Sequence, residues 1–262
     1  MWVFDNIGQN LFRECHMLTD LGSNWNLKIT TLNNYTQSYT FYNCYSLKTI
    51  PDKLLIGLAT GNYDNGQYNN GSASSDAYTH KYDHTFDGCL SLRKLYLSYK
   101  DWYTTGSSKH INNELFVDSF NRLAMLDTFK FTTRTLAEGY YYCTQSGFTI
   151  DLTNVGYCAN EADATILEGL YGTPVTTKEE YDAQKNNENW WSTNPEYSRF
   201  NLNSFKTAIQ YLPRMKNGAT ATIKFKSGLG SGTDAGGITT DDINVSSLLS
   251  YATEYGWTVA FV

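Results

Sequence analysis

A phrase made of an aromatic residue, a cysteine and two aliphatic residues at steps of three occurs three times in the N-terminal part of the chain. The copies are Phe12-x-x-Cys15-x-x-Leu18-x-x-Leu21, Phe41-x-x-Cys44-x-x-Leu47-x-x-Ile50 and Phe86-x-x-Cys89-x-x-Leu92-x-x-Leu95. Each copy provides one short apolar ridge, which cannot close a core by itself but can be buried by the ridge of a neighbouring unit. The repeat therefore predicts stacked coils, an architecture that more often holds a partner on its surface than carries out chemistry.

Two weaker copies follow the three clear ones. The first keeps the steps of three, with Phe120 in the cysteine position, and consists of Val117, Phe120, Leu123 and Leu126. The second is irregular and consists of Tyr140, Cys143, Phe148, Ile150 and Leu152. Successive copies start 29, 45, 31 and 23 residues apart. The shortest spacing is typical of leucine-rich repeats, and the longer ones are explained by insertions.

The segments FRECHMLTDL, FYNCYSLKTI and FDGCLSLRKLYL resemble the BspA-like leucine-rich repeats of bacterial surface proteins and of bacteriophage structural proteins. The resemblance covers residues 10–153, strongly in three units and weakly in two. It implies a short strand near the final L-x-x-L/I of each unit, with the Phe and Cys side chains stacked inside. The long insertions, and the stop after about five units, depart from a long regular horseshoe.

The composition argues against nucleic acid as a partner. Charged residues make up 18% of the 262 residues and the net charge is −6, whereas binding to a phosphate backbone requires a basic patch. Aromatic residues reach 15%, with 21 Tyr. Such a polar and aromatic surface suits contact with glycans or proteins, although exposed β-proteins are often built this way whatever they bind.

The N-terminal sequence and the hydropathy distinguish a virion protein from an exported surface protein. No apolar run is long enough to span a membrane, and no basic stretch precedes an apolar run at the N-terminus, so neither a membrane helix nor a secretory signal is predicted. An exported adhesin would need such a signal, whereas a virion protein would not. Because the first copy leaves little room for a cap, we expect a partner chain or upstream sequence to cover this end.

The five cysteines are predicted to be structural. Four occupy repeat positions, where a free thiol acts as a small apolar group, so we expect reduced, buried thiols. Their odd number and long spacing imply neither a disulfide framework nor a zinc site. They are Cys15, Cys44, Cys89, Cys143 and Cys158.

Two insertions, 58–84 and 98–113, both fall between the strand of one unit and the opening aromatic of the next. Insertions at one phase of a repeat emerge on one side of a stack, which is often the binding side, although such loops can also be mere spacers. Their aromatic residues are candidate binding residues. These are Tyr63, Tyr68, Tyr78, Trp102 and Tyr103.

The repeat is lost in residues 155–199, which we predict to be a connecting segment. Thr177-x-x-Glu180 before Tyr181 has the pattern of a capping box and predicts a short helix. Trp190 and Trp191 follow. They are candidates for a sugar-stacking platform or a docking anchor, with packing of this segment onto the repeats as the alternative.

Residues 200–262 are predicted to form an α/β unit that caps the repeats. A helix over 202–212 is expected to end at Pro213, and a half-buried strand over 220–226 follows it. Thr239 and Asp242 suggest the cap of a second helix, which ends at Gly256 before a final strand over 257–262.

We found no motif for catalysis or cofactor binding. Gly228, Gly230 and Gly232 match neither common nucleotide-binding pattern. His80 and His84 with neighbouring aspartates could hold a metal only on a helix, and their place at the end of an insertion favours solvated loop residues. We therefore predict neither catalytic residues, nor a metal, nor a cofactor.

The sequence thus predicts an α/β repeat solenoid over residues 1–154, a connecting segment over 155–199 and a capping unit over 200–262. The expected function is non-catalytic. The chain would be a structural or attachment protein of a bacteriophage virion that contacts other virion chains and a host glycan or receptor. A BspA-type adhesin of the bacterial surface is the alternative, and a virion enzyme that degrades polysaccharide is a third.

Overall fold

The structure is a computed structural model that describes residues 2–4, 10–22, 25–27, 38–50, 83–98, 116, 118–132, 142–143, 149–172, 176–184, 187–193, 200–215, 220–226 and 245–262. Its strands are β1 (Trp2–Phe4), β2 (Trp25–Leu27), β3 (Lys94–Ser98), β4 (Thr128–Thr132), β5 (Tyr142–Cys143), β6 (Thr149–Leu152), β7 (Arg214–Met215), β8 (Ala221–Phe225) and β9 (Trp257–Phe261). Its helices are α2 (Glu161–Tyr171), α3 (Lys178–Gln184), α4 (Glu188–Thr193), α5 (Leu202–Gln210) and α6 (Val245–Glu254).

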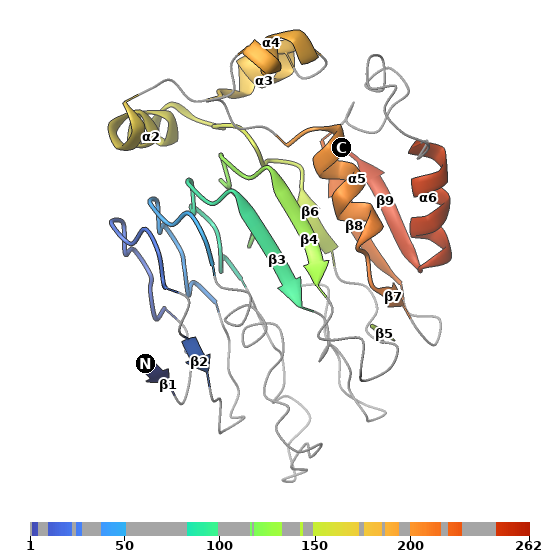
Figure 1. Cartoon of the computed structure of the whole chain (residues 1–262), viewed down its shortest axis with the longest axis horizontal. Coiled ribbons are helices and arrows are strands. Elements are labelled where there is room, and N and C mark those ends of the chain that lie inside the picture. Colours follow the sequence, from blue (N-terminus) through green and yellow to red (C-terminus); the bar gives the residue numbers. More distant parts are fainter. Residues whose placement is uncertain are drawn as a thin grey trace.

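The fold is mixed α/β, with parallel strands in small sheets, which confirms the predicted class (Figure 1). Within the described ranges, β1 pairs with β2, β3 with β4, and β5 with β7, and β6, β8 and β9 form a three-stranded sheet. Every one of these pairs is parallel. Parallel neighbours need a crossover connection, so each pair joins segments that are far apart in the chain.

Four successive turns place their phenylalanine rings in one column. The turns are residues 10–18, 39–47, 84–92 and 118–126. Adjacent rings lie 5.4, 6.0 and 6.3 Å apart, with interplanar angles of 7°, 10° and 17°. The rings are those of Phe12, Phe41, Phe86 and Phe120. This phenylalanine column forms one edge of the main hydrophobic core.

The backbone of these turns repeats as well. In each turn the residue two before the phenylalanine and the residue two after it have a positive φ, between 51° and 76°. Left-handed backbone is uncommon outside glycine, so its recurrence at the same two positions defines the turn independently of side-chain chemistry. The eight residues are Asn10 and Glu14, Tyr39 and Asn43, His84 and Gly88, and Asp118 and Arg122.

The fourth turn corrects the predicted register. Phe120 was expected in the cysteine position, but its ring stacks on Phe86 and therefore occupies the phenylalanine position. Leu123 then takes the cysteine position, and Phe129 on β4 pairs with Leu95 on β3. Apolar residues recur at steps of three both before and after Phe120. The sequence alone therefore allows Phe120 in either the cysteine position or the phenylalanine position.

Backbone hydrogen bonds connect each turn to the next. The amide of Phe12 donates to the carbonyl of Thr40 at 2.9 Å, and that of Phe41 donates to Thr85 at 2.9 Å. The cysteine thiols point back toward the preceding turn, since Cys44 Sγ donates to the Phe12 carbonyl at 3.0 Å. Cys89 Sγ donates to the Phe41 carbonyl in the same way, at 3.2 Å. Each of these carbonyls also accepts a backbone amide of its own turn, that of Cys15 or of Cys44, so the thiol occupies a second acceptor position and links one turn to the next.

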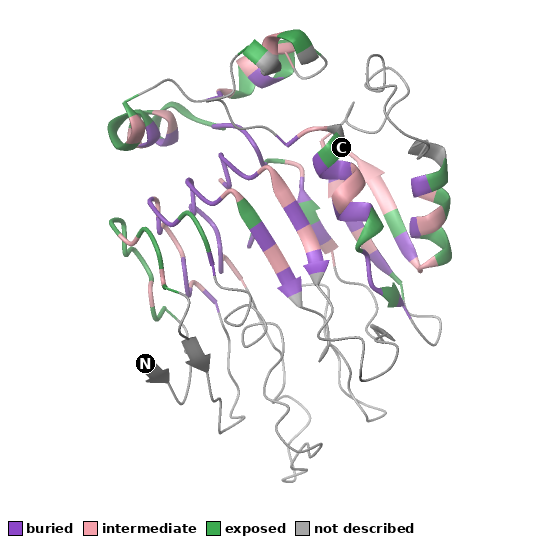
Figure 2. Ribbon diagram, viewed as in Figure 1, coloured by how far each residue is buried: buried purple, intermediate pink, exposed green. Residues whose placement is uncertain are grey.

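The first turn differs from the others in burial. Cys44, Cys89 and their aliphatic neighbours are fully buried, but Cys15 is exposed, and Phe12 and Leu18 are only partly buried (Figure 2). The prediction that Cys15 is buried is therefore wrong. By the geometry of its equivalents, its thiol points away from the second turn, to a side that no described residue covers.

The C-terminal residues form the predicted order of helix, strand, helix and strand. Helix α5 ends before Pro213, and α6 is followed by Gly256 at φ +84°, as expected for the glycine that ends a helix. Asn201 caps α5 in a reciprocal capping box with Ser204, which the sequence analysis missed. The predicted cap at Thr239 and Asp242 lies outside the described residues.

The predicted boundary at residue 154 crosses a sheet. Strand β6 in the first segment pairs with β8 in the C-terminal unit, with Ile150 opposite Ile223 and Leu152 opposite Phe225. Helix α5 contacts both β4 and α6. The repeats and the C-terminal unit therefore share one continuous core.

Helices α3 and α4 lie side by side at one edge of the molecule, and α2 lies apart from them along the same edge (Figure 1). Helix α2, which the sequence analysis missed, covers a second apolar cluster beneath it. Helix α3 begins after Thr177, whose Oγ1 accepts the Glu180 amide at 3.2 Å, so the predicted helix and its cap are confirmed. None of the helices in the described ranges has the length and apolar character needed to cross a membrane.

Candidate binding surface

A row of polar and aromatic side chains runs across the outside of the turns, and we call it the polar–aromatic row. It contains the left-handed residue that lies two positions before the phenylalanine in the second, third and fourth turns. It also contains the residue directly after the phenylalanine in the first, second and fourth turns. Its members are exposed or half-buried. They are Arg13, Tyr39, Tyr42, His84, Asp118 and Asn121.

The aromatic part of the row is held together by ring contacts between turns. Tyr39 stacks on His84, with ring centroids 4.8 Å apart and planes 16° apart, and Tyr42 meets the same imidazole edge-on at 6.0 Å. The Arg13 guanidinium lies over both tyrosine rings, at 5.1 and 5.4 Å from their centroids. Such cation–π contacts stabilise an exposed site by about 0.5–1 kcal/mol each.

Tyr39 and His84 have φ values of 62° and 51°. A bulky side chain in the left-handed region costs on the order of 1–3 kcal/mol, and residues held this way often occur at functional sites. Their rings nevertheless lie face to face on the surface. Since the stacked faces cover each other and the Arg13 guanidinium lies over the Tyr39 ring, the arrangement presents rigid ring edges and polar groups, which can bind a partner with little loss of entropy.

The polar part of the row is linked by ionisable groups. His84 Nδ1 lies 3.0 Å from Asp87 Oδ2, and its Nε2 lies 3.8 Å from Asp118 Oδ2. Asn121 Nδ2 donates to Asp118 Oδ1 at 2.9 Å. The row therefore passes without a break from the tyrosines to the carboxylate and amide of the fourth turn.

Asp87 lies beneath the row and is almost completely buried. Burial raises the pKa of its carboxyl, and this outweighs the hydrogen bond to His84 and the charge of Arg122. Its Oδ1 has no hydrogen-bond partner in the described part of the chain and lies 3.8 Å from Arg122 Nη1. The expectation that His84 and Asp87 are solvated loop residues is therefore wrong, because both belong to the ordered third turn.

Arg122 fastens helix α2 to the turns. Its guanidinium makes two hydrogen bonds to the buried Asp163 of α2, of 2.9 and 2.6 Å, and a third of 2.8 Å to Asn43 Oδ1. The hydrogen bonds to Asp163 raise the pKa of Arg122, so it stays charged. We call these three side chains, with Gly88, the arginine clamp.

Gly88 makes the reach to Asn43 possible. It occupies the third turn, between Asn43 in the second and Arg122 in the fourth, at φ +76°. A Cβ atom there would collide with Asn43 Oδ1 and would lie 3.1 Å from Arg122 Nη1. Because Gly88 has no side chain, the Arg122 side chain of the fourth turn can pass the third turn and reach Asn43 in the second.

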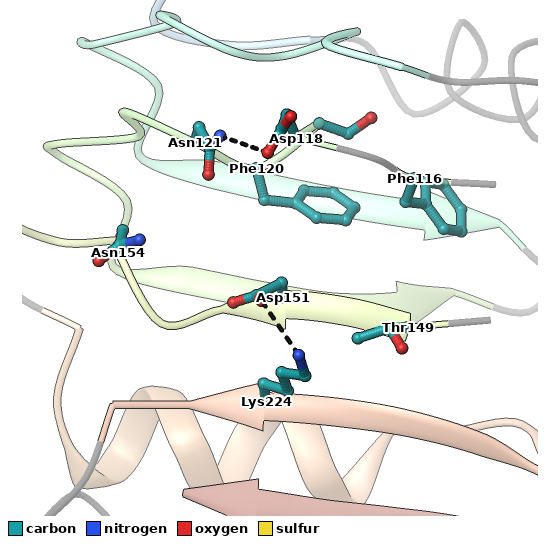
Figure 3. A pocket seen from close by; sticks show the side chains of 9 residues that line it. Phe116, Asp118, Phe120, Asn121, Thr149, Asp151, Asn154 and Lys224 are labelled. Carbon is teal, nitrogen blue, oxygen red and sulfur yellow. Dashed lines mark hydrogen bonds and ion pairs between the residues drawn. The ribbon is translucent and has the colours of Figure 1, made fainter. Parts of the chain in front are cut away.

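A pocket of about 410 Å³ lies at the end of the row, between the fourth turn and the sheet of β6 and β8 (Figure 3). Asp118 and Asn121 line it from the turn, and Asp151 and Lys224 line it from the two strands. Its remaining lining residues are Phe116, Ser119, Phe120, Thr149 and Asn154. A pocket of this size, with a few convergent polar groups, can hold a small ligand or one end of a larger one.

The alternation of β6 and β8 directs these side chains outward. On β6, Ile150 and Leu152 are buried, whereas Asp151 between them is exposed. Lys224 is its direct neighbour on β8, and the two charged groups are 3.7 Å apart. The apolar face of the same strands packs into the core, and the polar face is left open.

The thiols offer little chemistry. Burial raises the pKa of Cys44 and of Cys158 to about 12, and it raises that of Cys89 well above the usual value. Thiolate is the nucleophile and the metal ligand, so these three are inert at neutral pH. Within the described ranges, no group of three or more His, Cys, Asp or Glu side chains is placed to hold a metal ion.

The sequence-predicted binding residues are only partly described. Trp190 on α4 is half-buried and packs against the main core. Trp191 lies on the same helix, but its side chain is outside the described residues, as are Tyr63, Tyr68, Tyr78, Trp102 and Tyr103. The polar–aromatic row and the pocket were missed. The signal that could have revealed the row is the repeat itself, since its members lie one or two positions from a repeat phenylalanine.

No protein-family model, no curated protein and no solved structure matches this chain.

Proposed function

We propose that the chain is a BspA-like leucine-rich-repeat solenoid closed by its C-terminal α/β unit. The phenylalanine column, the paired left-handed residues and the hydrogen bonds from turn to turn support this proposal. The short parallel strands β3 and β4 follow the repeat phrase in the third and fourth turns, as the resemblance implies. In this view the repeats form a scaffold and their outer face carries the function.

We infer that the protein is a non-catalytic attachment or structural component of a bacteriophage virion. The observation that carries this inference is the polar–aromatic row, in which successive turns present aromatic and hydrogen-bonding groups side by side. Rigid tyrosine faces beside adaptable polar groups are typical of binding surfaces. The choice of a virion depends on the resemblance of the repeat phrases to those of phage structural proteins.

The first turn supports an assembled state. Met17 is 78% exposed and Leu11 is 38% exposed, and the apolar side chains of this turn are covered less than their equivalents in the later turns. A neighbouring chain placed against this turn would bury these groups and continue the stack. We therefore propose that other virion chains cover this end.

Immunogold labelling tests the proposed location. Antibodies raised against the purified chain would be applied to density-purified particles and to washed, uninfected cells from the same culture. We expect gold at a fixed position on the particles. Label confined to the cell surface would refute the virion role and favour the alternative of a BspA-type adhesin, and particles that lack the chain by mass spectrometry would also refute it.

A further inference from the structure

We propose that the pocket between the fourth turn and strands β6 and β8 binds an uncharged saccharide. The inference rests on the proposed attachment function and specifies what is attached. Side chains from three separated segments of the chain converge on this pocket, although they are up to about a hundred residues apart in the sequence (Figure 3). Several polar groups converge on this open pocket of about 410 Å³, and such groups fix the orientation of a small polar ligand.

The hydrogen-bonding capacity of the pocket matches hydroxyl groups. Asp118 uses Oδ1 for Asn121, and Asp151 uses Oδ1 for Thr153. Their Oδ2 atoms lie 3.8 Å from His84 Nε2 and 3.7 Å from Lys224 Nζ, beyond hydrogen-bond distance, so each can still accept a hydrogen bond. Asn154 accepts from the Tyr157 hydroxyl through Oδ1, which leaves its NH₂ group to donate. A sugar hydroxyl both donates and accepts, so neighbouring hydroxyls can pair with these alternating acceptors and donors.

The charge of the pocket selects against acidic ligands. Asp118 and Asp151 contribute two negative charges, and the one ammonium, that of Lys224, already lies 3.7 Å from Asp151 Oδ2. A phosphate, a uronic acid or a sialic acid would add negative charge beside these carboxylates. An uncharged sugar does not meet this repulsion.

Among the described residues that line the pocket, the two phenylalanines are buried, which argues against a peptide. Phe116 is 7% exposed and Phe120 is 2% exposed, so neither leaves a hole into which an apolar anchor could insert. Peptides that dock in grooves depend on such anchors.

The polar–aromatic row extends the site beyond one ring. Asp118 belongs to both the pocket and the row, and His84, Tyr39 and Tyr42 follow from it in contact with one another. Since these rings stack on one another or lie under Arg13, an oligosaccharide with its terminal residue in the pocket could bring its next rings to their exposed edges and polar atoms. We therefore expect affinity to rise with chain length, from about 1 mM for a ligand that fills only the pocket.

A glycan array with the full chain, followed by calorimetry with the best ligand, tests the proposal. The array would carry neutral, sialylated, uronic-acid-containing and phosphorylated glycans, and a peptide array would be probed in parallel. The pocket variants are Asp118→Asn, which keeps a residue that tolerates positive φ, Asn121→Ala and Lys224→Met. The matched controls are Asn203→Ala on α5 and Lys94→Met on β3, which are exposed residues outside the pocket.

We expect binding of neutral glycans, a loss of affinity of about tenfold for each pocket variant, and a change of less than about twofold for the controls. Unchanged circular dichroism and melting would show that the variants are folded. The proposal is wrong if no neutral glycan binds, if the pocket variants bind as the controls do, or if acidic glycans or peptides are preferred. Gold-labelled particles together with an array on which no glycan binds would refute this proposal and leave the virion role intact. Binding of neutral glycans together with label confined to the cell surface would support this proposal and refute the virion role.

Discussion

The arginine clamp gives the sharpest test of how the turns are held together, through the substitution Gly88→Ala. The change has two separable costs. Left-handed backbone at a residue with a Cβ costs roughly 1–2 kcal/mol, and displacing Asn43 from the Arg122 guanidinium loses a charged hydrogen bond of about 1.5–3 kcal/mol. We therefore expect the free energy of unfolding to fall by about 2.5–5 kcal/mol, and the melting temperature by about 5–20 °C for a chain of this size.

Gly172 supplies a matched control. It has nearly the same backbone, with φ +68°, but a Cβ built there meets no atom of the described residues within 4 Å. Gly172→Ala should therefore cost only the backbone strain of roughly 1–2 kcal/mol. The difference between the two variants isolates the contribution of the gap beside Asn43.

The measurement is urea denaturation followed by both circular dichroism and tryptophan fluorescence, whose transitions must coincide for a two-state analysis. Asn43→Gly in the Gly88→Ala background removes the amide that collides with the new Cβ and should lower the cost of the alanine toward the backbone strain, so the double-mutant cycle should be non-additive. If Gly88→Ala costs no more than Gly172→Ala, or if the cycle is additive, the gap has no role and our reasoning is refuted.

Three further predictions concern the core, the thiols and Asp87. Phe86→Leu should destabilise the protein by about 1–2 kcal/mol more than Phe12→Leu, because Phe86 is fully buried between the rings of Phe41 and Phe120 whereas Phe12 is only partly buried, and equal urea midpoints would contradict this. In a Cys143→Ser variant, a thiol reagent should modify the exposed Cys15 in the native state. It should reach Cys44, Cys89 and Cys158 only on unfolding. Rapid modification of all four thiols in the native state would show that these three are not buried. Since the pKa of Asp87 is raised in the fold, the folded carboxyl retains its proton while the unfolded one has lost it. Stability contributed by Asp87 should therefore fall as pH rises from its ordinary pKa through the raised value. In urea titrations, Asp87→Asn should gain stability relative to the native protein as pH rises from 4 to 7. A stability difference between the two proteins that does not change with pH would show that Asp87 titrates normally.

Periodicity was sufficient to predict the apolar positions of the turns and the helices and strands of the C-terminal unit. Phe41, Cys44 and Leu47 are fully buried, and α5, β8, α6 and β9 occur where the patterns indicate them. These features depend on neighbours three or four residues away, so a local reading of the sequence contains the necessary information. The loop candidates for binding stay predictions, since they lie outside the described residues.

The candidate site was not predictable in the same way. The polar–aromatic row requires knowing that Tyr39 and His84 have left-handed backbone and stack across an insertion. Helix α2 was missed because its apolar stripe is weak and its attachment depends on Asp163, a buried charge with a partner 41 residues away. A carboxylate in an otherwise polar helix gives no local sign that it is buried.

The sequence by itself determined that ridges with a step of three must stack, because no single ridge can bury itself. The tertiary structure decided which residues meet. It placed Phe120 in the column over Phe86, although the apolar steps allow another frame, because only ring stacking and the left-handed residues on either side distinguish the two. It also passed Arg122 over Gly88 to Asn43, 79 residues away, and joined β6 to β8 beside the pocket. Such contacts depend on the relative position of whole turns, which is set by packing in three dimensions and has no counterpart in the spacing of residues along the chain.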